Sequence, residues 1–174
     1  MDWGFVFYVI YALLMMAFLL WITAILVYAM IFGGPYAPAA MNRVETMVKL
    51  LKLKKGQRMV DLGSGDGRIV IAFAQKGIEA HGYEINPVLV LMSRLKIRRL
   101  GLQKLAQIHF KDYWQDNFSK YDAVTLYVSP LVVGSIGKKL RRELKKRGQV
   151  VSNSFKIPHL KIVKEENGVM LYRN

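Results

Sequence analysis

Val60-Asp61-Leu62-Gly63-Ser64-Gly65-Asp66-Gly67-Arg68 places three alternating glycines between a short apolar run and a segment with helical periodicity. Backbone that passes within contact distance of a ligand cannot carry side chains, so this spacing is typical of a loop that binds a nucleotide. A dinucleotide fingerprint would need a further glycine where this chain has Arg68, and a phosphate-binding P-loop would need Gly-Lys-Ser/Thr after the turn. The stretch therefore predicts a nucleotide ligand without a pyrophosphate.

Acidic residues around this loop narrow the choice of ligand. Asp61 and Asp66 lie within it, and Glu84 closes the next apolar run, 17 residues after Gly67. A carboxylate about 20 residues past such a loop accepts both ribose hydroxyls in a Rossmann unit. Three carboxylates disfavour a phosphate but suit a ligand that carries a sulfonium and an ammonium. We therefore expect S-adenosylmethionine; a tight structural turn without a ligand is the alternative, and the position of Glu84 weighs against it.

A long apolar run precedes this region. The 30 residues from Trp3 to Phe32 contain no charge, whereas about 20 apolar residues suffice to cross a bilayer. A cleaved signal peptide would begin with basic residues, but the only charge before the run is Asp2. We expect residues 1–33 to form a single-span membrane anchor and residues 34–174 to form one catalytic domain.

The charge of the chain suggests its orientation. All 26 Lys and Arg residues and 11 of the 12 acids follow the span, a net of +15. The positive-inside rule then places the C-terminal domain on the cytoplasmic side. This basic excess has three interpretations: a solvated surface, a nucleic-acid site, or attraction to an anionic membrane face. The membrane interpretation needs the fewest assumptions, and without a recognised nucleic-acid motif we expect no nucleic-acid partner.

Apolar periodicity predicts an alternation of strands and helices after a Gly-Pro-rich linker at 33–38. Strands are expected at 58–62, 79–84, 106–111, 123–128 and 149–155, with a closing hairpin of 161–163 and 169–172, and helices at 39–53, 67–76, 87–100 and 131–147. Such alternation predicts an α/β fold, Rossmann-like, with a mostly parallel sheet and an antiparallel C-terminal end.

Packing faces and isolated side chains give further expectations. In the first helix Met41, Val44, Val48 and Leu51 should form the buried face, and Val132, Ile136, Leu140 and Leu144 should do so in the basic helix. Trp114 is expected in the core, and a position covering the acceptor site is the alternative. The three histidines, His81, His109 and His159, are well separated in the sequence, so no metal site is expected.

Ligands of parallel sheets bind beyond the carboxyl ends of the strands. Gly63, Glu84, Asp112 and Ser129 all follow or close predicted strands. Four separated segments should therefore converge on one crevice.

With these residues placed, the chain resembles the class I S-adenosylmethionine-dependent methyltransferases. It is similar in particular to the membrane-anchored lysine methyltransferases that act on the ATP synthase c-subunit and the adenine nucleotide translocase, and to their prokaryotic relatives. The landmarks are Gly34-Pro35-Tyr36-Ala37-Pro38, Asp61 to Val70, Gly82-Tyr83-Glu84-Ile85-Asn86-Pro87 and Ser93-Arg94-Leu95.

The resemblance implies that Glu84 binds the ribose, that the glycine loop lies against the cofactor and that Asp112 and Tyr113 edge the adenine. The expected cofactor-binding residues are Asp61, Gly63, Ser64, Gly65, Asp66, Gly67, Glu84, Ile85, Asn86, Asp112 and Tyr113. Tyr36, Ser129 and Pro130 are the candidates for the acceptor channel; for Tyr36 an interfacial aromatic that anchors the end of the span is an equal alternative. An aromatic-rich stretch of the family is replaced here by Asn153-Ser154-Phe155-Lys156-Ile157-Pro158, so the acceptor does not carry over.

The leading hypothesis is a membrane-tethered protein-lysine methyltransferase with a membrane protein as acceptor. A lipid or small-molecule methyltransferase and a non-catalytic, cofactor-binding scaffold are the alternatives. An RNA methyltransferase stays open through the basic charge.

Overall fold

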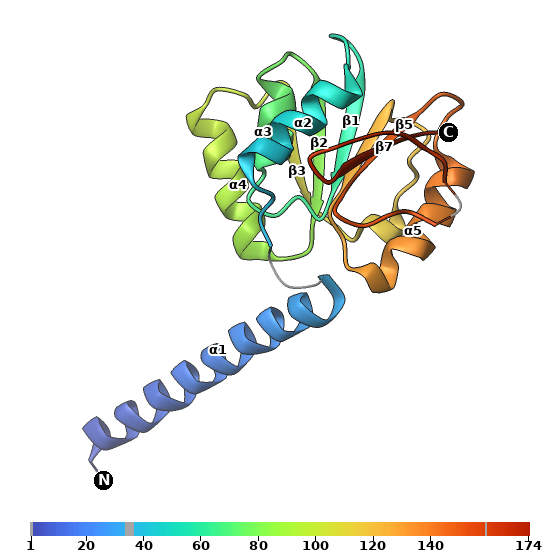
Figure 1. The fold of residues 1–174 in the computed structure, drawn as a ribbon. Helices are drawn as coiled ribbons and strands as arrows, with labels where there is room; N and C mark the ends of the chain where they lie inside the picture. Colours follow the sequence, from blue (N-terminus) through green and yellow to red (C-terminus); the bar gives the residue numbers. More distant parts are fainter. Residues whose placement is uncertain (1, 34–36, 159) are drawn as a thin grey trace. The chain divides into compact units, whose positions relative to one another are not determined.

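A computed structural model describes residues 2–33, 37–158 and 160–174, which form two compact units, 1–35 and 36–174 (Figure 1). The first unit is a single helix, α1 (Trp3–Gly33). Its stretch Trp3–Val27 is long and apolar enough to cross a membrane, and none of that stretch is buried. Length and composition of this kind suit a membrane anchor and a signal sequence alike.

The second unit, which we call the catalytic unit, is built on one seven-stranded sheet. Its strands are β1 (Arg58–Leu62), β2 (Glu79–Glu84), β3 (Ala106–Phe110), β4 (Ala123–Leu126), β5 (Gln149–Asn153), β6 (Ile162–Glu166) and β7 (Val169–Arg173). They lie in the order β3-β2-β1-β4-β5-β7-β6. The first five are parallel, and β7 pairs antiparallel with β5 and β6. The predicted α/β fold, with its antiparallel C-terminal end, is confirmed.

Register brings the carboxyl ends of the central strands together. Leu62 at the end of β1 lies beside Tyr83 of β2 and Leu126 of β4. The loops that follow these strands therefore emerge at one edge of the sheet, which we call the ligand edge. Glu84, the last residue of β2, pairs with Phe110, the last residue of the edge strand β3.

Helices cover the two faces of the sheet unequally. The helices are α2 (Met41–Leu51), α3 (Arg68–Ala74), α4 (Pro87–Arg99) and α5 (Pro130–Glu143), with a short 3-10 helix η1 (Tyr113–Gln115). The helices α2, α3 and α4 cover one face of the sheet and α5 covers the other (Figure 1). Buried side chains of α2, α3 and α4 belong to one apolar core, and those of α5 belong to the other. Between β3 and β4 the second face has only η1 and a loop whose Phe118 and Tyr121 are buried in that core.

Several sequence expectations are wrong in detail. On α2 Val44 and Leu51 are buried as predicted, but Met41 is exposed and Val48 half-buried. Thr46, Met47 and Leu50, which were not predicted, complete the buried face. The helix is therefore rotated from the predicted phase. Thr46 tolerates burial because its Oγ1 donates to the Asn42 carbonyl at 2.8 Å.

Two further corrections concern α5 and Trp114. On α5 the predicted Val132 is only half-buried, and its neighbour Val133 is buried instead. Ile136, Leu140 and Leu144 are buried as predicted. Trp114 lies in the 3-10 turn and is 38% exposed, so it is not a core residue.

Candidate cofactor and acceptor site

The three glycines of the loop after β1 have different reasons to lack a side chain. Gly63, Gly65 and Gly67 all have positive φ angles of 75°, 54° and 79°. A Cβ on Gly63 would meet nothing within 4 Å, so this backbone faces open space where a ligand can approach. A Cβ on Gly67 would lie 2.9 Å from Cβ of Ser93, so Gly67 serves the packing of the loop on α4.

Ser64 ties the loop to β2 and keeps one polar atom unused. The backbone N–H groups of Gly63 and Ser64 both donate to the Tyr83 carbonyl at 2.9 Å. The Ser64 side chain is buried against Gly82, and its Oγ has no hydrogen-bond partner among the described residues. Buried hydroxyls are normally bonded, so an unpartnered one beside an open glycine backbone fits a site for a polar ligand.

Glu84 is held at the end of β2 by backbone donors. Its Oε2 accepts the Gly65 N–H, and its Oε1 accepts the N–H groups of Ile85 and Asn86, each at 2.8 Å. Asn86 in turn caps α4, because its Oδ1 accepts the N–H of Val88 at 3.0 Å. Ile85 and Asn86 thus orient the carboxylate through their amides, and two carboxylate oxygens with three accepted bonds retain acceptor capacity for a ligand hydroxyl.

Asp61 is the most perturbed acid of the site. Its carboxyl is buried, and Thr125 Oγ1 donates to its Oδ1 at 2.7 Å. The pKa of Asp61 is raised to about 7, mainly by burial and also by the negative charges of Glu84 and Asp66, while the hydrogen bond from the Thr125 hydroxyl opposes the rise. A buried acid with a pKa near neutrality is typical of a functional site and would become an anion beside a bound cation.

Both carboxylate oxygens of Asp66 are hydrogen-bonded to cationic side chains of the protein. Arg68 Nε donates to its Oδ1 at 2.9 Å, and Lys96 Nζ donates to its Oδ2 at 2.7 Å. Although burial alone would raise the pKa of Asp66, the hydrogen bonds and charges of Arg68 and Lys96 lower it to about 2. Arg68 Nη1 also donates to the Ala39 carbonyl at 2.8 Å, which holds the start of the catalytic unit at the ligand edge. These contacts give Asp66 a structural role in joining the loop to α4.

Asp112 and Tyr113 follow β3 as expected. Asp112 Oδ1 accepts the N–H of Trp114 at 3.0 Å and so starts the 3-10 turn. Burial raises the pKa of Tyr113, and the charges of Asp112 and Glu84 raise it further. These two carboxylates therefore act electrostatically on the Tyr113 ring. The Trp114 ring centroid lies 5.4 Å from that of Tyr113, so aromatic surface borders this side of the crevice.

The expected acceptor residues are less closely tied to the loop. Ser129 caps α5, its Oγ accepting the Leu131 N–H at 3.3 Å, and Pro130 is the first residue of that helix. Both follow β4, the neighbour of β1, and so lie at the ligand edge. Tyr36 lies outside the described residues.

An aromatic pair near the acceptor candidates escaped the sequence reasoning. Tyr127, directly after β4, stacks on Phe155, just past β5, with ring centroids 6.2 Å apart. Arg43 of α2 fixes the segment before Phe155, because its Nη1 donates to Asn153 Oδ1 at 2.9 Å. The signal available in the sequence was that both aromatic residues follow neighbouring predicted strands.

The histidines correct another expectation. His81 Nδ1 lies 3.0 Å from His109 Nε2, and His81 Nε2 lies 3.0 Å from Glu79 Oε1, so two of the three are in contact rather than separated. Burial and the charge of His81 lower the pKa of His109. Within residues 2–33, 37–158 and 160–174 no group of three or more His, Asp or Glu side chains is arranged to hold a metal ion. His159 lies outside the described residues.

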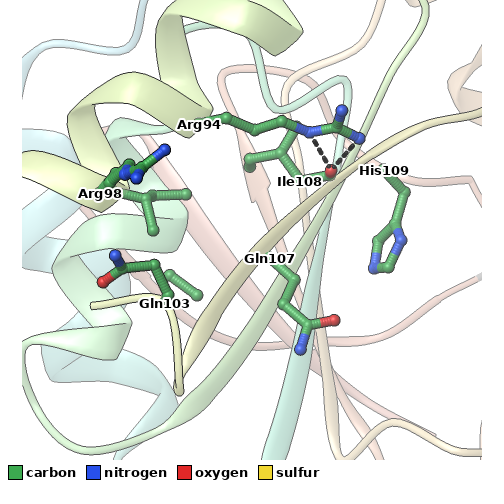
Figure 2. A pocket seen from close by; sticks show the side chains of 8 residues that line it. Arg94, Arg98, Gln103, Gln107, Ile108 and His109 are labelled. Atoms are coloured by element: carbon green, nitrogen blue, oxygen red, sulfur yellow. Dashed lines mark hydrogen bonds between the residues drawn. The ribbon is translucent and has the colours of Figure 1, made fainter. Parts of the chain in front are cut away.

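A hollow of about 370 Å³ lies elsewhere, beside β3 (Figure 2). It is lined by Arg94, Ile97, Arg98, Gln103, Ala106, Gln107, Ile108 and His109. Figure 2 shows Arg94 reaching over the strand, where its Nε and Nη2 donate to the Ile108 carbonyl at 2.9 and 2.7 Å. None of the predicted site residues lines this hollow, so it is distinct from the crevice at the ligand edge.

Comparisons with known proteins agree with this geometry. Residues 61–164 match the profile of the ANTKMT methyltransferase domain. The chain is 42% identical over 125 residues to the human ATP synthase c-subunit lysine N-methyltransferase, covering 72% of this chain and 53% of that protein. It is 30% identical over 141 residues to a protein-lysine N-methyltransferase of Saccharolobus islandicus (strain REY15A), covering 78% of this chain and 88% of that protein.

A solved structure, described as an RNA methyltransferase from Salinibacter ruber in complex with S-adenosyl-L-homocysteine, superimposes with a TM-score of 0.73 at 31% identity. The match covers 79% of this chain and 92% of that one. The predicted class I methyltransferase fold and its dependence on S-adenosylmethionine are confirmed. The chain spans about half the length of the human relative.

Proposed function

This chain belongs to the ANTKMT methyltransferase family, and we propose on that premise that it methylates lysine side chains of a membrane protein, using S-adenosylmethionine. The observation that carries the proposal is 30% identity to a protein-lysine N-methyltransferase over 88% of that protein's length. The human relative is named for lysine methylation of the ATP synthase c-subunit, a membrane protein, which favours an acceptor of that kind.

Three features of the loop region would hold the cofactor. The backbone at Gly63, which faces open space, would lie against the flat surface of the cofactor, and Glu84 would accept hydrogen bonds from the ribose hydroxyls. The ionised form of Asp61 would face the cationic amino-acid end of the cofactor. Asp112 and Tyr113 border the adenine. Asp66, whose oxygens are bound to Arg68 and Lys96, supports the loop instead of the ligand.

When bound, S-adenosylmethionine would supply a methyl group on a sulfonium; the lone pair of the acceptor amine would attack the methyl carbon in line, and the thioether S-adenosylhomocysteine would leave. The protein therefore has to align the acceptor amine and exclude water, and a strong nucleophile of its own is unnecessary. Tyr127 and Phe155 would flank the aliphatic chain and cationic head of an incoming lysine, and Ser129 and Pro130, which follow Tyr127 in the chain, would border the same channel. Burial lowers the pKa of that lysine and frees its lone pair.

The proposal includes an anchor. The helix α1 stays attached and spans the membrane once, with the catalytic unit on the cytoplasmic side. Mass spectrometry of the membrane-extracted protein tests this part, because an intact N-terminus is expected and cleavage within residues 1–36 would contradict it.

RNA methylation is the second candidate. The Salinibacter ruber protein is described as an RNA methyltransferase, and the present chain has a formal net charge of +14, which suits a polyanion. Lysine methylation is preferred because the relatives aligned in sequence include a protein-lysine methyltransferase over nearly its whole length.

One labelling experiment separates the candidates. The full chain in host membranes receives cofactor with a labelled methyl group, and protein, RNA and lipid fractions are counted separately. We expect label in one membrane-protein band that yields methylated lysine on acid hydrolysis, and no label with Glu84→Ala. Label confined to RNA or lipid would overturn the lysine proposal. Cofactor binding by calorimetry without label in any fraction would favour a non-catalytic scaffold.

A further inference from the structure

The catalytic unit exposes large apolar side chains mainly at its ligand edge. In the described part of this unit, ten large hydrophobic side chains are exposed, and six of them lie at the ends of strands or the first turns of helices on this edge. We call these six the apolar rim: Val88, Leu91, Met92, Phe110, Trp114 and Leu131. Leu131 is 92% exposed, Phe110 61% and Leu91 60%. Such a concentration around a crevice marks an interaction surface.

The helix α4 shows that this exposure is built into the sequence pattern. Its buried residues are Val90, Ser93 and Ile97, yet Val88, Leu91 and Met92 project from the other side at helical spacing. A helix whose outer side faced only water would carry polar residues there. The first two turns of α4 are therefore apolar on both sides, which indicates a partner for the outer side.

The rim residues come from separate elements around the crevice. Phe110 ends β3, Trp114 lies in η1, and Leu131 is the second residue of α5 on the opposite side of β1 in the sheet order. The chain also enters the unit here, since Arg68 Nη1 donates to the Ala39 carbonyl. A lipid surface accepts such scattered protrusions without a matching shape, and Trp is a residue that suits the boundary between headgroups and acyl chains.

Charge favours the same partner. The helix α4 contains no acid, and its Lys96 reaches the glycine loop, where its Nζ donates to Asp66 at 2.7 Å. Lys111 directly follows Phe110, and Lys156 is exposed beyond the end of β5. Cations around an apolar patch are attracted to anionic headgroups, and a unit tethered to the membrane reaches them at high effective concentration.

We propose that the apolar rim inserts into the surface of an anionic lipid bilayer, so that the crevice opens at the membrane. This inference rests on the proposed anchoring by α1, and it adds a second, peripheral membrane contact made by the catalytic unit itself. The methyl acceptor would then meet the crevice at the level of the headgroups.

The three tryptophans of the chain allow the anchor and the rim to be tested separately. The full chain is reconstituted in vesicles of zwitterionic and anionic phospholipids with brominated acyl chains, which quench tryptophan fluorescence on contact. Trp3→Phe with Trp21→Phe leaves Trp114 as the reporter of the rim. Trp3→Phe with Trp114→Phe leaves Trp21 as the reporter of α1.

We expect quenching of both reporters, and for Trp114 a roughly twofold or greater loss of quenching with Leu91→Glu. Leu100→Glu is the matched control, because Leu100 is a similarly exposed leucine, at 52%, just past the other end of α4. It should leave the Trp114 signal unchanged. Both sites are exposed, so neither change disturbs the core.

Quenching of Trp21 without quenching of Trp114 would overturn the inference and leave the anchor intact. Absence of Trp21 quenching would instead refute the anchoring itself. A Trp114 shielded from both brominated lipid and aqueous acrylamide would show that a protein, a second copy or a partner, covers the rim, and this outcome would also overturn the inference.

Discussion

Binding of S-adenosylmethionine is predicted to release a proton from Asp61. This carboxyl is buried with a pKa of about 7, so it is mostly neutral in the free protein at pH 6. A cationic amino-acid group placed beside it favours the ionised form and lowers that pKa. The cofactor therefore binds the deprotonated protein preferentially, and its affinity depends on pH.

The magnitude follows from the pKa. About 0.9 of the Asp61 carboxyls are protonated at pH 6 and about half at pH 7, so binding should release roughly 0.9 and 0.5 protons respectively. The affinity should rise roughly fivefold from pH 6 to pH 7. The ammonium of the ligand, with a pKa of about 7.7–8.0, stays largely protonated across this range.

Calorimetry measures the release directly. Titrations at pH 6 in two buffers with different heats of ionisation give the number of protons exchanged, and S-adenosylhomocysteine, which keeps the ammonium, serves as a second ligand. Asp61→Asn preserves the acceptor for the Thr125 hydroxyl and should bind more weakly with no proton release. Equal release by the wild type and Asp61→Asn would refute the assignment of Asp61 to the cationic end of the cofactor.

Three further predictions concern the same loop. Glu84→Ala should weaken cofactor binding by roughly 2–4 kcal/mol, and it should also lower the melting temperature because it leaves three backbone N–H groups unpaired. Glu84→Gln should reduce affinity and melting temperature by less. An unchanged dissociation constant for Glu84→Ala would rule out the ribose contact. Gly82→Ala places a methyl group 2.6 Å from the Ser64 side chain and should cost about 1–3 kcal/mol of unfolding free energy. Gly134→Ala in α5, whose added methyl group lies 3.8 Å from its nearest neighbour, Pro158, should be neutral or stabilising by up to about 1 kcal/mol. Similar melting curves for the two variants would contradict this packing. Because the pKa of Asp66 is lowered to about 2, its ionised form contributes about 2 kcal/mol to the free energy of unfolding above pH 3.8, and this contribution is lost as the pH falls through 2. Asp66→Asn should therefore make the free energy of unfolding less dependent on pH in this acid range. An unchanged pH dependence would exclude the ion pair with Lys96.

The strands that carry the site could be predicted because their boundaries are marked locally. The bounds of β1 and β2 agree with the sequence prediction at both ends, since each is a short apolar run closed by a turn or a helix cap. The order of alternating elements then fixed the parallel sheet and placed Glu84 and Gly63 at one edge.

What escaped prediction depends on contacts between distant segments. Lys96 lies 30 residues from Asp66, so no local pattern reveals that this acid is already paired. The contact of His81 with His109 arises only from the pairing of β2 with β3. Tyr127 and Phe155 meet in the same way across β4 and β5.

The phase of α2 was missed for a different reason. A pattern based on apolar residues assigns Thr46 to the surface. Its hydroxyl can be buried, however, because it donates a hydrogen bond to a carbonyl of the helix backbone. Trp114 was assigned to the core by its residue type, whereas a 3-10 turn of three residues has no face large enough to bury it.

The bond from Arg94 to the Ile108 carbonyl has a consequence for the behaviour of many copies together. β3 is the last strand on its side of the sheet, and an open strand edge is a template for pairing with another chain. With its guanidinium over an outward carbonyl, Arg94 occupies an acceptor that the strand of a neighbouring copy would need, and so makes pairing at this edge less favourable.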